Sequence, residues 1–131
     1  MSVNVPLVAG GDINPSRFVT IDTTARYTVV ESNSGDTKIL GISDESTKNA
    51  PQTGGSDLHA ESGDHVRIFG YTEDPLLKLG GTVTAGDFIK PDNAGKGVTA
   101  GAAAVAAAIA LESGVDGDLI KVQIVLFSVP A

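Results

Sequence analysis

The chain has no cysteine and no tryptophan, and its 131 residues include only four Phe and two Tyr. Without cysteine, disulfides, thiolate nucleophiles and cysteine-based zinc sites are all excluded. Without tryptophan, the chain has few of the aromatic side chains from which carbohydrate-binding platforms are built. These absences remove several common routes to catalysis and ligand binding.

Positive charge is also scarce, with 9 Lys and Arg against 16 Asp and Glu and a formal net charge of −7. No cluster of basic residues occurs, so nucleic acid and anionic membranes are not expected as partners. The longest apolar run, 102–111, is half as long as the about 20 residues of a membrane-spanning helix. The N-terminal stretch lacks a charged first region and contains Pro6, so we expect no secretory signal and synthesis in a cytoplasm.

Glycine is abundant instead, with 16 residues, and short runs rich in Val, Ile, Leu and Thr recur between turn signals. These runs cover 17–22, 27–32, 37–43, 65–71, 76–84, 87–91, 95–100 and 119–127. Many short strands at such spacing predict a mainly β fold, a small antiparallel β-barrel or sandwich rather than βαβ units.

Three segments interrupt this pattern. Residues 1–16 contain two prolines and a Gly-Gly pair, which suit a central strand poorly, so we predict an extended N-terminal arm followed by a single β domain, 17–131. Residues 43–64 form one long polar loop of the kind that is functional or mobile. The alanine-rich segment 101–113 has the composition of a helix, but alternation of Val105, Ile109 and Leu111 also permits a strand with its alanine face tightly packed.

The phrase small-Gly-Asp recurs four times at uneven intervals, and each copy precedes a strand-like run. A glycine can adopt positive φ and an aspartate can bond nearby backbone N–H groups, so the phrase predicts a structural turn. The alternative is a Ca²⁺ site, although each copy supplies fewer carboxylates than a calcium loop. The turn residues are Gly35, Asp36, Gly63, Asp64, Gly86, Asp87, Gly117 and Asp118.

Other candidate chemistry is limited. His59 and His65 lie among acidic residues but lack a third strong ligand at defined spacing, so we expect solvated loop histidines. No G-x-S-x-G elbow or phosphate-binding loop is present. The sequence therefore predicts a protein that is not an enzyme and has no metal or cofactor.

Some apolar residues lie on the faces of strands that a single-layer barrel would expose to solvent. The end of the last strand is apolar on both faces, which suggests that it is covered again by the chain itself or by another subunit, or that it forms a local core. The N-terminal segment carries a similar apolar strip. The candidate subunit or capsid interface residues are Val3, Val5, Leu7, Val8, Phe69, Tyr71, Val125 and Phe127.

Four phrases stand in a distinctive order: ILGISDES, AESGDHVRIFG, GGTVTAGDFIKPDNAGKGV and AAAIALESGVDGDLIKVQIV. In that order, over roughly 39–125, the chain resembles the small bacteriophage capsid decoration (cement) proteins. The resemblance implies a β-barrel-like homotrimer on the exterior of an icosahedral head, where it binds the major capsid protein and stabilises contacts between capsid subunits. It also implies a virion protein assembled in the host cytoplasm, with no catalytic residues.

A second hypothesis belongs to a different class. The chain could be a non-catalytic carbohydrate- or calcium-binding β module of a tail or surface protein. Exposed aromatic platforms or a metal-dependent stability would favour it.

Overall fold

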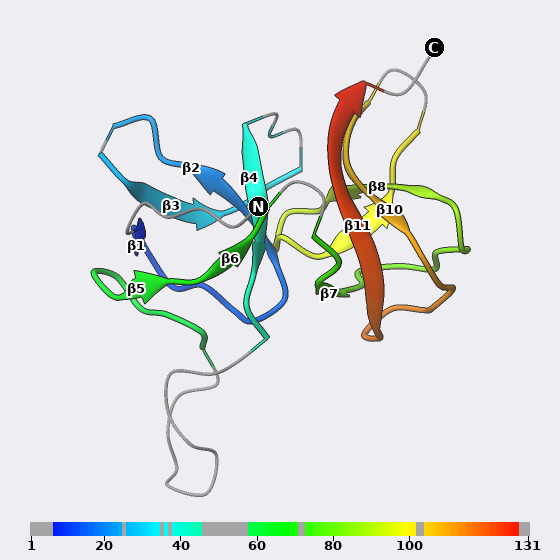
Figure 1. The fold of residues 1–131 in the computed structure, drawn as a ribbon, viewed down its shortest axis with the longest axis horizontal. Coiled ribbons are helices and arrows are strands. Elements are labelled where there is room, and N and C mark those ends of the chain that lie inside the picture. The colour runs from blue at the N-terminus through cyan, green and yellow to red at the C-terminus, as the bar shows by residue number, and fades with distance from the viewer. Residues whose placement is uncertain are drawn as a thin grey trace, which may run out of the picture.

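The computed structural model describes residues 7–24, 26–34, 36, 38–45, 58–70, 73–101 and 104–128, with the backbone alone for 126–128. These residues form strands joined by turns, and none of them lies in a helix (Figure 1). The strands are β1 (Leu7–Ala9), β2 (Phe18–Ile21), β3 (Thr28–Glu31), β4 (Ile39–Ser43), β5 (His65–Val66), β6 (Ile68–Phe69), β7 (Leu76–Lys78), β8 (Phe88–Pro91), β9 (Gly97–Thr99), β10 (Val105–Ala110) and β11 (Leu119–Ser128). The expectation of a mainly β, barrel-like fold is confirmed.

Strands β1 to β6 form one curled sheet in the order β5-β1-β3-β2-β4-β6, which we call barrel 1. Its edge strands β5 and β6 are separated in sequence only by Arg67, so the two edges meet in one continuous stretch of chain. The Arg67 N–H donates to Nε2 of His59 at 3.1 Å, which satisfies the backbone group between the two edges. The pairs are antiparallel except for β1 with β3, which is parallel.

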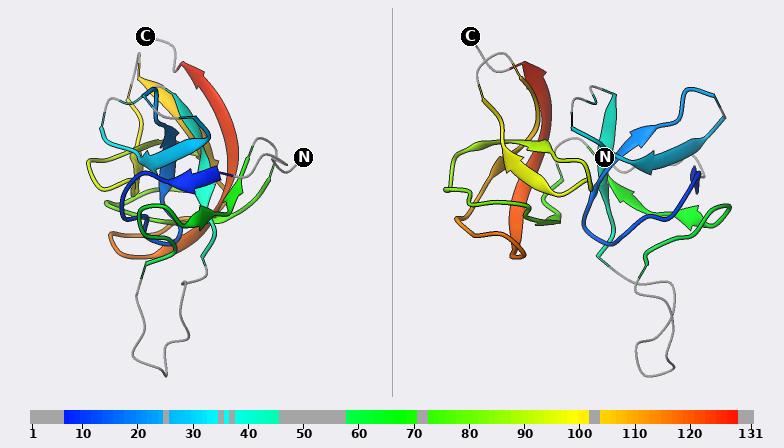
Figure 2. Two further views of the ribbon diagram at one scale, coloured as in Figure 1. Left: turned by 90° about the vertical axis from the view of Figure 1, so that its left-hand side faces the viewer. Right: turned by 180° about the vertical axis from the view of Figure 1, so that it is seen from behind.

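Strands β7 to β11 form a second sheet in the order β7-β11-β10-β8-β9, which we call barrel 2. Its edges approach each other through a parallel bridge between Leu79 and Gly97, where the Gly80 N–H donates to the Gly97 carbonyl at 2.8 Å. The two barrels lie side by side (Figures 1 and 2).

The two barrels repeat one topology, in which β1, β2, β3, β4 and the β5–β6 stretch correspond to β7, β8, β9, β10 and β11. Equivalent pairings recur: Ala9 with Val29 and Leu79 with Gly97; Ile13 with Ala60 and Val83 with Gly114; Ser43 with Ile68 and Ala110 with Val122. Positions 70 residues apart also carry the same amino acid at Leu7/Leu77, Gly10/Gly80, Gly11/Gly81, Phe18/Phe88 and Asp22/Asp92. The chain is therefore a structural duplication.

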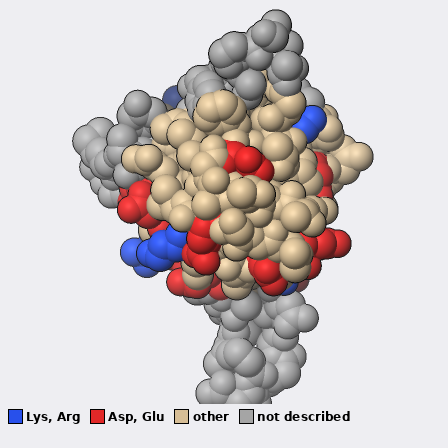
Figure 3. All heavy atoms as spheres, turned by 90° about the vertical axis from the view of Figure 1, so that its right-hand side faces the viewer, with Lys and Arg blue, Asp and Glu red and all other residues tan. Residues whose placement is uncertain are grey.

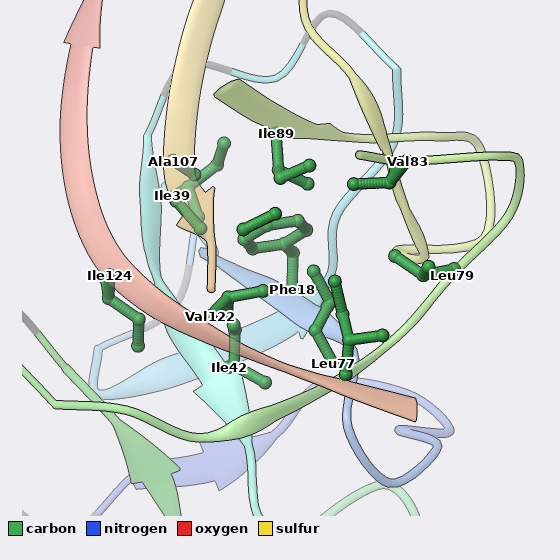
Figure 4. Close-up of a cluster of buried hydrophobic side chains, with 13 residues drawn as sticks. Phe18, Ile39, Ile42, Leu77, Leu79, Val83, Ile89, Ala107, Val122 and Ile124 are labelled. Carbon is green, nitrogen blue, oxygen red and sulfur yellow. The ribbon is translucent and has the colours of Figure 1, made fainter. Parts of the chain in front are cut away.

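Each barrel encloses an apolar interior, and barrel 1 also contributes to the interior of barrel 2. The interior of barrel 1 consists of Leu7, Ala9, Ile13, Val19, Val29, Ala60, Val66 and Ile68. The second cluster joins Phe18, Ile39 and Ile42 of barrel 1 to the inward side chains of barrel 2. Figure 4 shows the Phe18 ring surrounded by Ile89, Leu77 and Val122. Because they share this cluster, the barrels pack as one unit.

Backbone hydrogen bonds fix the junction between the barrels. The Phe18 N–H donates to the Gly95 carbonyl at 2.8 Å, and the Lys78 N–H donates to the Ser16 carbonyl at 2.9 Å. Gly95 has φ of +73°, and a Cβ there would lie 3.0 Å from the Phe18 carbonyl oxygen. The turn between β8 and β9 can approach barrel 1 this closely because residue 95 is glycine.

The interpretation of residues 7–16 as part of an arm is wrong. Strand β1 lies inside the sheet, paired with β3 on one side and β5 on the other, and Ile13 is fully buried. Pro15 and the Gly-Gly pair did not prevent this, because they lie outside the three-residue strand. Residues 1–6 lie outside the described residues, as do residues 46–57 of the long loop.

The alanine-rich segment forms a strand, β10, over Val105–Ala110. β10 pairs with β8 and β11, and Ala106, Ala107, Ala108 and Ala110 are buried. Pairing on both edges and close packing outweigh the helical preference of alanine.

One difference between the barrels predicts a stabilising substitution. Ser16 has φ of +57° at the position where barrel 2 has Gly86, with φ of +92°. Ser16 is buried, and its Oγ has no hydrogen-bond partner among the described residues. We expect Ser16→Gly to raise the free energy of unfolding by about 1 kcal/mol. The substitution removes the cost of a left-handed backbone conformation and the cost of a buried hydroxyl group without a hydrogen bond. Together these gains exceed the stability that is lost because glycine makes the unfolded chain more flexible.

Urea unfolding measures this change, and the reciprocal substitution Gly86→Ser is the matched control, expected to lower stability by a similar amount. A Ser16→Gly variant that is less stable than the parent would contradict the prediction.

Candidate interaction surfaces

The four small-Gly-Asp phrases share one local geometry. In each copy, the aspartate Oδ2 accepts a hydrogen bond from the backbone N–H three residues earlier. The pairs are Asn33 with Asp36 at 2.8 Å, and Glu61 with Asp64, Thr84 with Asp87 and Val115 with Asp118 at 2.9 Å. Gly63, Gly86 and Gly117 have φ between +88° and +92°, and Gly35 lies outside the described residues. These carboxylates thus stabilise turns ahead of strands.

The duplication also explains why the phrases are unevenly spaced. Asp64 and Asp118 are equivalent, since they precede β5 and β11 and form the same bonds to the strand ends at Ala9 and Leu79. Asp36 precedes β4 and Asp87 precedes β8, so these two occupy different positions of their barrels.

The described residues contain no group of three or more His, Cys, Asp or Glu side chains that could hold a metal ion. His59, expected in solvent, is instead buried and accepts the Arg67 N–H, while His65 is exposed. Asp22 forms a local turn in which the hydroxyl and N–H of Thr24 lower the pKa of its carboxyl. Within the described part of the chain, no helix is long and apolar enough to span a membrane.

A hollow lies at the junction of the barrels. Its lining includes the half-buried Phe69 and Leu76 beside Lys121. The remaining lining residues are Glu45, Glu73, Asp74 and Pro75. Three carboxylates around an apolar floor suit a basic side chain of a partner protein.

Exposed large apolar residues gather on barrel 2. Among the described residues they are Tyr27, Phe88, Leu111, Val115 and Leu119, and all but Tyr27 belong to barrel 2. Figure 3 views the molecule from the barrel 2 side, where residues other than Lys, Arg, Asp and Glu cover much of the face, with carboxylates both within it and along its lower part. Exposed apolar residues that gather on one side of a protein are typical of contact sites, so this side of the molecule is a candidate docking surface.

The residues predicted for an interface fall in different places. Leu7 is buried inside barrel 1, and Val8 is half-buried in β1. Phe69 packs at the junction against the barrel 2 cluster, and Val125 is half-buried on β11. Phe127 pairs with Ala106 through its backbone. Val3, Val5 and Tyr71 lie outside the described residues.

Sequence reasoning did not place Phe88 or Leu111 in a candidate interface. A signal for Phe88 was present, because it lies 70 residues after Phe18 and both phenylalanines follow a Gly-Gly pair at the same distance, in GGDINPSRF and GGTVTAGDF. A comparison of the chain with itself would have identified the two phenylalanines as equivalent.

No protein-family model matches the sequence, and no curated protein matches it significantly. Among solved structures, the N-terminal base of the head fiber protein gp8.5 of bacteriophage phi29 has a similar fold. The similarity has a TM-score of 0.59 and covers 95% of this chain and 95% of that one, at 16% sequence identity. At this identity, the likeness establishes a shared fold.

Proposed function

We propose that this chain is a structural protein of a bacteriophage virion that binds the exterior of the head. The observation that carries the proposal is the fold shared with the phi29 head fiber base over 95% of both chains. The order of the four sequence phrases, which resembles that of capsid decoration proteins, supports it independently.

The proposed partner is the major capsid protein, and the proposed form is a homotrimer assembled in the host cytoplasm. A protein that binds the assembled shell but not its free subunits stabilises the shell by its binding free energy. Three linked contacts would bind more tightly than one through avidity. A net charge of −7 keeps the protein away from DNA, and the role requires no catalytic residue.

The test uses heads of the encoding phage that were assembled without this protein. We expect the purified chain to sediment with the heads and to raise the temperature at which they release DNA. Heads already saturated with the protein are the control and should bind no more. A chain that stays in the supernatant at every concentration would overturn the proposal.

A further inference from the structure

The turn that leads into β2 differs from its equivalent in barrel 2. The Arg17 carbonyl accepts the Ser43 N–H at 2.8 Å. The Asp87 carbonyl accepts the Ala110 N–H in the same way at 2.9 Å, so Arg17 and Asp87 are equivalent. Barrel 2 therefore has the Gly-Asp pair of the recurring phrase at 86–87, whereas barrel 1 has Ser-Arg in its place.

The Ser-Arg pair is less favourable locally than Gly-Asp. Ser16 has a left-handed φ of +57°, and its buried Oγ has no hydrogen-bond partner among the described residues. The buried Nε of Arg17 also lacks a partner there. Buried polar groups are nearly always hydrogen-bonded, and strained residues gather at functional sites. Because a guanidinium N–H can only donate, the partner that Arg17 lacks is a hydrogen-bond acceptor.

A different carboxylate holds the turn in barrel 1. In barrel 2, the Thr84 N–H donates to Oδ2 of Asp87 at 2.9 Å. The equivalent N–H in barrel 1 belongs to Asn14, and it donates to Oε2 of Glu31 at 2.5 Å. Glu31 thus takes the place of the turn aspartate, so the side chain of Arg17 is not needed to hold the turn.

Ser16 and Arg17 line a hollow of about 290 Å³ between the two barrels. Lys78 lies beside them, because its N–H donates to the Ser16 carbonyl at 2.9 Å. The remaining lining residues are Asn14, Pro15, Glu45 and Leu119. Pockets for small molecules usually have about 300–1,000 Å³, so this hollow has room for a single side chain rather than a larger ligand.

The hollow is positively charged although the protein is acidic. Arg17 and Lys78 are half-buried, and neither has an ion-pair partner among the described residues. Glu45 supplies the carboxylate among the described lining residues, which leaves one unit of positive charge. A single carboxylate would balance this charge, whereas a phosphate dianion would exceed it. Leu119, which is 48% exposed, adds an apolar edge.

We propose that this hollow binds the carboxylate of an acidic side chain on a partner protein. Arg17 and Lys78 pair with the carboxylate, and the unpartnered donors of Ser16 and Arg17 gain an acceptor. Leu119 packs against the methylene groups of the same side chain. The inference rests on the proposed function for its partner, which is the major capsid protein.

The first test uses the full chain alone and follows the arginine Nε–H groups by NMR. The probe is N-acetylglutamate α-amide, which has one carboxylate, and its control is the uncharged N-acetylglutamine α-amide. We expect the glutamate probe to shift the Arg17 Nε–H resonance until it saturates, and the control to leave it unchanged. Arg67 should not respond, because it is already paired with Asp44 at 3.4 Å.

An Arg17 resonance that does not respond to the glutamate probe overturns the inference. Inorganic phosphate is added in a separate titration. A response to phosphate without a response to the glutamate probe would assign the hollow to a phosphate-bearing ligand, which also overturns it.

Two variants test the lining residues, with binding followed at the backbone amides around the hollow. Lys78→Gln removes one cation. The double variant Ser16→Gly with Arg17→Asp installs the pair that barrel 2 carries, so we expect it to fold. Each should bind the glutamate probe at least about tenfold more weakly, as expected for loss of a charged hydrogen bond.

Lys38→Gln is the matched control for these variants. Lys38 is exposed and does not line the hollow, but its substitution changes the net charge as Lys78→Gln does. It should bind the probe as the parent does. A Lys78→Gln variant that binds the probe as tightly as Lys38→Gln contradicts the proposal.

Head binding separates this inference from the proposed function. We expect Lys78→Gln to bind heads assembled without this protein about tenfold more weakly than the parent, and Lys38→Gln to bind them equally well. If Lys78→Gln binds heads as the parent does, the inference is wrong and the virion role stands. A parent that binds the glutamate probe but not heads would refute the virion role and support the hollow as a carboxylate site.

Discussion

Phe18→Ala is expected to lower the free energy of unfolding by about 3–5 kcal/mol, the usual cost of truncating a buried phenylalanine. Phe18 is fully buried at the junction, where its side chain from barrel 1 fills the interior of barrel 2. The substitution therefore removes contacts inside barrel 2 as well as the packing between the barrels. Urea unfolding followed by circular dichroism gives the change.

The duplication supplies the matched control. Phe88→Ala deletes the same side chain at the equivalent position, but Phe88 is partly exposed and should cost about 1 kcal/mol or less in the isolated chain. Both variants should be compared at a protein concentration where the chain is monomeric, because subunit contacts add to apparent stability. Equal losses in the two variants would show that the barrels do not share a core.

Gly41→Ala is expected to cost about 3 kcal/mol through a clash with backbone. A Cβ at residue 41 would lie 2.0 Å from the Phe69 carbonyl oxygen and 3.0 Å from the Phe69 carbonyl carbon. Because β4 and β6 pair at this point, the atoms cannot move aside without loss of the pairing that closes barrel 1. Thermal unfolding and hydrogen exchange of the β4 and β6 amides measure the effect.

Gly11→Ala serves as the control for Gly41→Ala, since a Cβ at residue 11 meets nothing within 4 Å. It should change stability by less than about 0.5 kcal/mol. A Gly41→Ala variant as stable as Gly11→Ala would mean that the β4–β6 pairing does not require glycine.

Elements that depend on local sequence were predicted correctly, whereas elements that depend on pairing with distant strands were not. The mainly β class followed from β-branched runs between turn signals, and it holds in both barrels. The arm and the ambiguous alanine segment depended on pairing partners far away in sequence. β1 has partners in β3 and β5, and β10 has partners in β8 and β11. Whether β1 and β10 form strands depends on pairing with these partners, which the local amino-acid preferences do not reveal.

The interface residues named from the sequence stay predictions. Val125 was among them because an end of β11 with two apolar faces is unusual, and the structure shows it half-buried. Phe88 was overlooked because a phenylalanine in a short strand normally belongs to the interior. Its exposure becomes clear only by comparison with Phe18.

By itself, the sequence determined the β class and the local turns, because an aspartate bonding to an N–H three residues earlier needs nothing from the rest of the chain. Only the tertiary structure decided which of two equivalent phenylalanines is buried. Phe18 and Phe88 sit in the same local pattern, and burial depends on whether another barrel packs over the strand. That packing joins residues about 70 positions apart, beyond the reach of any local pattern.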